Sequence, residues 1–212
     1  MSEFKTNTPR ENSKAEGARK VKRPRKISER YLRNSGLYYL QRYTASTAHF
    51  RKVMTQKITK SCDFHKDQDK EECLKHLETV IAEFLEMGYL DDSAYARGTV
   101  FSLRRKGLSA RMIQMRMKQK GIDEEITTKM LDQYAYENPP YEDEADISED
   151  FRAAITLAKR KKIGPYYLKP IKDEEEKQKL YARWLGAFGR AGFDYQTCRK
   201  VLELDLNEFE DC

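Results

Sequence analysis

The segment spanning residues 88–122 constrains the fold most, because it carries the start and stop signals of two consecutive helices. Aspartate and serine side chains can accept hydrogen bonds from the free N–H groups at a helix start, and glycine readily ends a helix. The segment offers these signals in the order needed for a helical hairpin: Asp91, Asp92, Gly107, Ser109 and Gly121. We therefore predict two helices joined by a glycine turn.

The same segment is free of acidic residues from Ser93 to Ile122. It nevertheless contains eight basic ones: Arg97, Arg104, Arg105, Lys106, Arg111, Arg116, Lys118 and Lys120. In a chain with 41 basic and 35 acidic residues, this segregation favours a surface that contacts polyanions. These residues, with Phe101 between Arg97 and Arg104 on one helix face, are the candidate partner-binding residues. The sequence does not indicate which of them contact protein and which contact phosphate. The alternative to a binding surface is an ordinary helix face that is exposed only to solvent.

Composition indicates an all-α fold. Hydrophobic residues make up 39% of the chain and charged residues 36%. No region alternates apolar and polar residues, and no Asn-Gly or Asp-Gly hairpin turn occurs. No apolar stretch reaches the roughly 18 to 20 residues that span a bilayer, and the N-terminus lacks a secretory signal. Four unevenly spaced cysteines do not suggest a disulfide framework, so we expect a cytoplasmic protein.

The apolar spacing predicts about nine helices. Their expected ranges are approximately 28–43, 46–58, 69–87, 91–107, 109–121, 123–136, 151–163, 173–190 and a last helix from 194. Residues 1–27 form a predicted disordered basic tail, and 28–136 form the first and second helical modules. An acidic linker over 137–150 precedes a third module over 151–212.

A weak internal repeat supports the division into modules. Ser46, Ser109 and Asp194 each stand at the expected start of the second helix of a hairpin. Apolar residues recur four and eight positions after each of them: Phe50 and Met54, Ile113 and Met117, Cys198 and Leu202. The pattern predicts three related helical modules that bury their apolar faces against one another.

Two constellations bear on chemistry. Cys62, His65, Cys73 and His76 have residue types that could bind zinc, although the spacing is not that of a standard finger. The alternative is that Cys73 packs in a helical core and the others lie at the surface, and we expect no metal or other cofactor. Trp184 and the pair Tyr166–Tyr167 could stack on bases, although Trp184 has the spacing of a core residue.

No catalytic motif occurs: there is no glycine-rich phosphate loop, no Gly-x-Ser-x-Gly and no His-Glu-x-x-His. We therefore expect a protein that is not an enzyme.

Several short motifs resemble the RecX family of bacterial recombinase regulators. They are G-Y-L-D-D-x-x-Y-A at 88–96, R-R-K-G at 104–107, K-G-I at 120–122, A-G-F-D-Y at 191–195 and R-K-V-L at 199–202. The resemblance covers about residues 28–205. It implies a curved, elongated array of tandem three-helix repeats that acts as a monomer without catalysis. It also implies binding to the RecA filament on single-stranded DNA and inhibition of its ATPase, extension and strand exchange, and so a role in regulating recombinational DNA repair. The long basic tail and the acidic linker depart from the family pattern.

Two other functions fit the residues. The central hairpin could act as a helix-turn-helix that binds DNA directly, although it lacks a helix start rich in Asn, Gln and Arg for reading bases. Weak direct binding to DNA is compatible with the regulator as well. The third reading is a zinc-stabilised adaptor, which depends on the four cysteine and histidine residues above.

Overall fold

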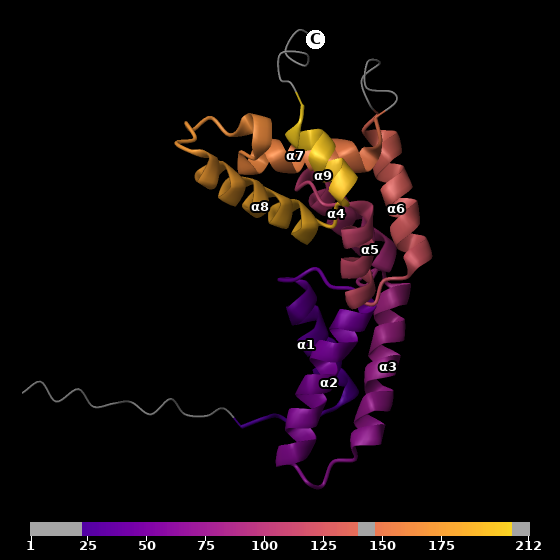
Figure 1. Ribbon diagram of the computed structural model, residues 1–212. Coiled ribbons are helices and arrows are strands. Elements are labelled where there is room, and N and C mark those ends of the chain that lie inside the picture. The colour runs from indigo at the N-terminus through magenta and orange to yellow at the C-terminus, as the bar shows by residue number, and fades with distance from the viewer. Residues whose placement is uncertain (1–22, 140–146, 205–212) are drawn as a thin grey trace, which may run out of the picture.

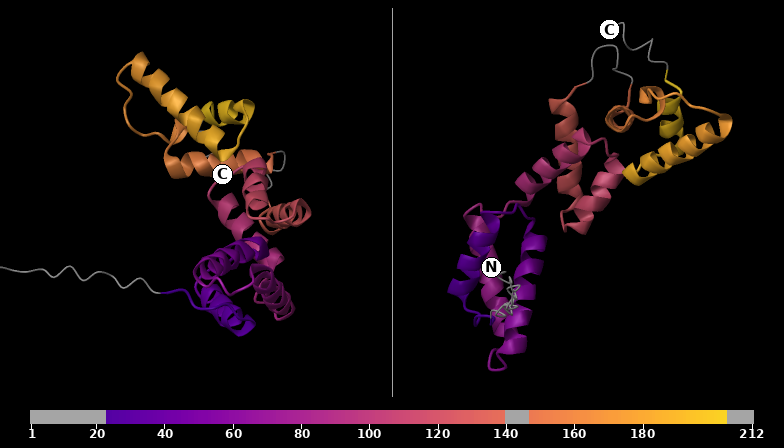
Figure 2. Two further views of the ribbon diagram at one scale, coloured as in Figure 1. Left: turned by 90° about the horizontal axis from the view of Figure 1, so that it is seen from below. Right: turned by 90° about the vertical axis from the view of Figure 1, so that its left-hand side faces the viewer.

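A computed structural model describes residues 23–139 and 147–204. These residues form nine α-helices and one short 3-10 helix, and the same ranges contain no strand. The helices form three successive modules along an elongated, bent molecule, and α8 projects to one side of it (Figures 1 and 2). The predicted all-α fold, a curved array of tandem three-helix repeats, is confirmed.

The helices follow one another in three groups of three. The first module contains α1 (Glu29–Leu40), α2 (Thr47–Phe64) and α3 (Lys70–Glu86). The second contains α4 (Asp92–Arg105), α5 (Ala110–Gln119) and α6 (Glu124–Glu137). The third contains α7 (Glu149–Lys161), the 3-10 helix η2 (Gly164–Tyr166), α8 (Glu174–Ala191) and α9 (Tyr195–Leu202). None of the helices in the described ranges is long and apolar enough to cross a membrane.

Each module has its own apolar core. The first core includes Leu32, Phe50, Met54, Leu77, Val80 and Phe84. The second includes Ala96, Val100, Leu103, Ile113 and Met117, and the third Ala154, Leu157, Phe188, Cys198 and Val201. Burying each large apolar side chain stabilises the fold by roughly 1.5–3 kcal/mol, so the three small cores are the main source of stability within the modules.

The end of the predicted tail is ordered, contrary to our expectation. Ile27 is 6% exposed and belongs to the first core. Its N–H donates to Gln68 Oε1 and its carbonyl accepts from Gln68 Nε2, each at 2.9 Å. A single isoleucine in a basic run produces no apolar periodicity, so this contact could not be predicted from the spacing of apolar residues. Residues 1–22, the rest of that prediction, lie outside the described residues.

Two further boundaries differ from the predictions. Helix α2 continues to Phe64, beyond the expected end at Ile58, because Ser61 is buried and its hydroxyl donates to the carbonyl of Arg25 at 2.8 Å. Helix α7 begins at Glu149, inside the range predicted as a linker. Residues 140–146 of that range are not among the described ones.

The internal repeat was misaligned in its third copy. Ser46 and Ser109 cap α2 and α5, the middle helices of their modules. Asp194 caps α9, the last helix of the third module, whereas the middle helix α8 is capped by Asp173. Apolar spacing repeats along any amphipathic helix, so it did not distinguish the two positions.

The first and second modules meet end to end at two helices. The N-terminus of α2 lies against the C-terminus of α5, where Ser46 Oγ donates to the carbonyl of Lys120 at 2.6 Å. The next N–H, of Thr47, donates to Asp92 Oδ1 of α4 at 2.8 Å. The contact thus satisfies an N–H group at the start of α2 and a carbonyl at the end of α5, both of which lack an intrahelical partner.

The second and third modules meet in the same way. The N–H of Ser109, at the start of α5, donates to the carbonyl of Ala191 at the end of α8, at 3.0 Å. The N–H of Ala110 donates to Asp150 Oδ1 of α7 at 2.9 Å. At both boundaries, therefore, the start of one module's middle helix meets the end of the next module's middle helix. An aspartate from the first turn of that next module accepts a hydrogen bond from the helix start. We call this arrangement the module junction.

We predict that Gly107→Ala destabilises the protein more than Gly88→Ala. Both glycines adopt φ of about +71°, so both alanines carry the left-handed strain of about 1–2 kcal/mol. A Cβ at Gly107 would also lie 2.6 Å from the carbonyl oxygen of Ala153 in α7, whereas Gly88 has open space around it. Overpacking adds about 1–3 kcal/mol. Urea unfolding of both variants measures the difference, and equal losses would show that α7 does not pack on this turn.

Candidate interaction surface

The central hairpin of α4 and α5 is built as its sequence predicted. Asp91 Oδ1 accepts from the N–H groups of Ser93 and Ala94 at 2.8 and 2.9 Å. Ser109 Oγ accepts from the N–H of Met112 at 3.2 Å, and a glycine in the left-handed region follows each helix. Five apolar side chains hold the pair together and are at most 9% exposed: Ala96, Val100, Leu103, Ile113 and Met117. The hairpin is thus a fixed platform for the charges on it.

Seven of the nine candidate binding residues are exposed on this platform: Arg97, which is described below, and the six residues Arg105, Lys106, Arg111, Arg116, Lys118 and Lys120. None of the six side chains forms an ion pair within the described part of the chain. We call these residues the basic hairpin surface. Since Arg111 and Lys118 are seven residues apart, they share one side of α5, and Arg116 and Lys120 share another. Uncompensated cations of this density attract anionic groups of a partner.

Arg104 is not part of that surface, and its inclusion among the binding residues is corrected by the structure. The residue is 6% exposed. Its Nη1 donates to Asp150 Oδ1 at 2.6 Å and to the carbonyl of Leu108 at 3.1 Å. The carboxylate of Asp150 therefore accepts both from Arg104 and from the start of α5, which makes Arg104 a component of the second module junction.

Arg97 and Phe101 face α6. Both carboxylate oxygens of Glu137 accept from Arg97 Nη2, at 3.1 and 2.9 Å. This arginine, helped by Gln133, lowers the pKa of the Glu137 carboxyl below its usual range. The guanidinium also lies 4.7 Å from the centre of the Phe101 ring, which packs edge-on against Tyr134. These two candidates stabilise the second module, and only the exposed half of Arg97 is available to a partner.

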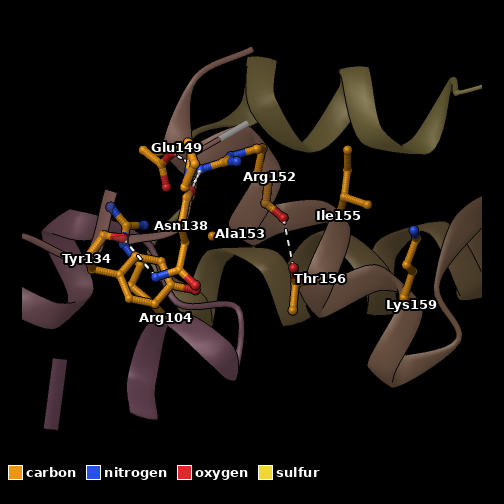
Figure 3. A pocket seen from close by; sticks show the side chains of 10 residues that line it. Arg104, Tyr134, Asn138, Glu149, Arg152, Ala153, Ile155, Thr156 and Lys159 are labelled. Carbon is orange, nitrogen blue, oxygen red and sulfur yellow. Dashed lines mark hydrogen bonds and ion pairs between the residues drawn. The ribbon is translucent and has the colours of Figure 1, made fainter. Parts of the chain in front are cut away.

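A cavity of about 370 Å³ lies where α4, α6 and α7 meet (Figure 3). Arg152 is central to it: its Nη2 donates to the carbonyl of Asn138 at 2.8 Å and to Glu149. The Nε atoms of Arg104 and Arg152 are buried and have no hydrogen-bond partner among the described residues. Because Glu149 and Asp150 compensate the two arginines, this cavity is not a strongly basic site.

The four zinc candidates do not converge. His65 Nε2 lies 2.8 Å from the carbonyl of Pro24, and His76 lies 4.0 Å from Glu29 and Glu72. Burial, with the neighbouring Cys62, raises the pKa of the Cys73 thiol to about 11, although zinc binds the thiolate. Within residues 23–139 and 147–204, no group of three or more His, Cys, Asp or Glu side chains is arranged to hold a metal ion.

The comparisons with known proteins agree on one family. The model of "RecX, second three-helix domain" matches residues 91–131, which span α4, α5 and part of α6. The regulatory protein RecX of Myxococcus xanthus (strain DK1622) is 34% identical over 182 residues, covering 86% of this chain and 89% of that protein. This chain belongs to the RecX family.

Other relatives extend the match along the chain. The regulatory protein RecX of Agrobacterium fabrum (strain C58 / ATCC 33970) is 29% identical over 187 residues, covering 85% of this chain and 86% of that protein. The crystal structure of RecX from Lactobacillus salivarius superposes with a TM-score of 0.51 over 87% of this chain and 97% of that one, at 17% identity. That structural likeness concerns the fold. The basic hairpin surface of this RecX family member lies in the module that the family model matches.

Asp92 and Asp150 were not recognised from the sequence as junction residues. Asp92 was predicted only as a cap of its own helix, and Asp150 as part of a linker. One signal could have identified them: each stands in the first turn of the first helix of its module. The same place in successive repeats indicates a shared contact.

We predict that Arg104→Ala and Asp150→Ala are coupled. Because Arg104 is buried, the pair should contribute a coupling energy of about 1–2 kcal/mol, reduced by the partial exposure of Asp150. A double-mutant cycle of urea unfolding measures it. Arg199–Glu203 is the matched control, with the same 2.6 Å separation at the surface, and its coupling should be close to zero. Equal coupling in both pairs would contradict a structural role for Arg104.

Proposed function

We propose that this protein is a non-enzymatic regulator that binds the RecA recombinase filament on single-stranded DNA. Binding would inhibit the filament's ATPase, its extension and strand exchange, and so regulate recombinational DNA repair. Membership of the family, whose relatives are named regulatory proteins, supports the assignment. The observation that carries it is the basic hairpin surface, whose six cations are exposed and uncompensated within the described chain.

The shape of the molecule supports binding to a filament. A filament repeats its surface along a helical path, and an elongated array can contact more than one protomer at once. Several weak contacts made together raise the overall affinity without any tight single site. The module junctions favour this mode because they fix the relative positions of the modules, so less freedom is lost on binding.

A dedicated DNA reader is the second candidate, and the environment of α5 speaks against it. A recognition helix contacts base edges through its N-terminal residues. In this chain that end is occupied: Ser109 is fully buried, and the N–H groups of Ser109 and Ala110 donate to Ala191 and Asp150 of the third module. Weak contact of the exposed cations with phosphates remains part of the proposal.

We further propose that the protein acts as a monomer in the cytoplasm. The thiols of Cys73 and Cys198 are buried within separate cores and unpaired, which suits a reducing compartment.

The direct test is a titration of the protein into the single-stranded-DNA-dependent ATPase of its cognate RecA. We expect inhibition below one molecule per RecA protomer, and excess DNA should not relieve it. Inhibition that disappears when more DNA is added would instead indicate competition for DNA, and no inhibition would overturn the proposal.

For the variant Arg105→Glu/Lys106→Glu, the concentration that gives the same inhibition should be at least about tenfold higher than for the original protein. Reversing two charges at a contact costs about 1.4 kcal/mol or more of binding free energy. The control is Lys70→Glu/Lys75→Glu on α3, which makes the same change of net charge at exposed lysines of the first module. Circular dichroism establishes that both variants are folded. If both inhibit like the original chain, the hairpin is not the contact surface.

A further inference from the structure

A second cavity, of about 440 Å³, lies in the third module. It is bounded by the end of α7, the loop that follows η2, and one side of α8, which projects from the molecule in Figure 1. Its lining combines cations, aromatic rings and apolar side chains. Tyr167 and Trp184, two of the aromatic candidates for base stacking, are among the lining residues.

The cavity is strongly basic. Five of its lining residues are cationic: Lys161, Lys162, Lys169, Arg183 and Arg190. All five are exposed, and none forms an ion pair within the described ranges. The lining includes no carboxylate, unlike the cavity of Figure 3, where Glu149 contacts Arg152. The charge of this cavity is therefore complementary to a polyanion rather than to another part of the described chain.

The same cavity contains aromatic rings. Tyr167 and Trp184 lie with their ring centres 5.4 Å apart at an interplanar angle of 62°. Trp184 was expected in the core because of its spacing with Leu180 and Phe188. Those two are buried, and Trp184 is partly buried: it packs against the third core and also lines the cavity.

One of these five cations, Lys162, has an unusual backbone conformation. Lys162 follows α7 in the left-handed region, with φ of 54° and ψ of 59°, and it is the one non-glycine residue of the described chain with positive φ. Glycine is the usual residue at such a helix end. The strained lysine places a positive charge beside Lys161 at the mouth of the cavity.

We propose that this cavity binds single-stranded DNA without sequence preference, with a base stacked on Trp184 and the adjacent phosphates on the surrounding lysines and arginines. Aromatic side chains within a cationic groove are the combination that holds single strands, because every base has a face that can stack. The site goes beyond the proposed regulation of RecA: it requires no recombinase, and its affinity should lie in the weak range of non-specific contacts, about 10⁻⁴–10⁻⁶ M.

The chain provides its own reporter, since Trp184 is its single tryptophan. A short thymidine oligomer titrated into the full-length protein at low salt should quench tryptophan fluorescence in a saturable manner. Rising salt should reverse the quenching, because phosphate contacts release counterions. An abasic oligomer of equal length should quench little, since it offers phosphates without a base.

Variants separate the two contributions. Lys169→Glu/Arg183→Glu should weaken binding of a fluorescein-labelled oligomer, measured by anisotropy, at least about tenfold. Trp184→Leu should weaken it by a similar factor and Trp184→Phe by less, because phenylalanine can still stack. Lys52→Glu/Lys60→Glu on α2, with the same charge change at exposed residues, should bind like the original protein. Circular dichroism confirms that each variant is folded.

Three results would overturn the proposal: no quenching by the oligomer, equal quenching by the abasic one, or equal weakening by the α2 control. Displacement of the oligomer by a polyglutamate peptide at equal charge would reassign the cavity to an acidic protein segment. None of these results bears on the inhibition of RecA through the basic hairpin surface, so the two proposals fail independently.

Discussion

The module junction is the contact on which the rest of this structure depends. Three small cores cannot by themselves fix how the modules sit relative to one another. At each boundary, the start of one middle helix lies on the end of the next, and its first residue donates to a free carbonyl there: the Ser46 hydroxyl to Lys120, and the Ser109 N–H to Ala191. An aspartate of the following module then caps the same helix start, at 2.8 Å from Thr47 N and 2.9 Å from Ala110 N.

Small residues are required where these helices meet. A Cβ on Gly121 would collide with the side chain of Ala48, and one on Gly192 with the hydroxyl of Ser109. Each glycine follows a middle helix whose end meets the start of the preceding module's middle helix. Both module junctions therefore repeat the same hydrogen bonds and the same close approach at a glycine. This repetition explains why the two boundaries are alike although the helices and loops differ in length.

The junction also decides which charges are left for a partner. Asp150 both caps α5 and holds Arg104, and Glu137 holds Arg97 against α6. Two cations of an acid-free segment are thus compensated by acids from elsewhere in the chain. The remaining six lie exposed on two sides of α5 and at the turn before it, so the positive charge left for a partner is confined to the hairpin.

The sequence was informative about features that depend on neighbouring residues. The caps at Asp91 and Ser109, the glycine turns and the buried face of the hairpin all follow from local spacing and were predicted correctly. Contacts between modules could not be predicted, because helical periodicity identifies the side of a helix on which Arg104 lies but not what packs there. For the same reason the single residue Ile27 and the aromatic cavity around Trp184 became evident only from the structure.

Protection of lysines from chemical modification would show whether the basic hairpin surface contacts the RecA filament. Reductive methylation followed by mass spectrometry would compare each lysine in the free protein and in the protein bound to assembled RecA filaments. We expect a several-fold loss of reactivity at Lys106, Lys118 and Lys120 and unchanged reactivity at Lys70 and Lys75 of α3. Unchanged reactivity at the three hairpin lysines in a complex that inhibits the ATPase would contradict the proposed contact.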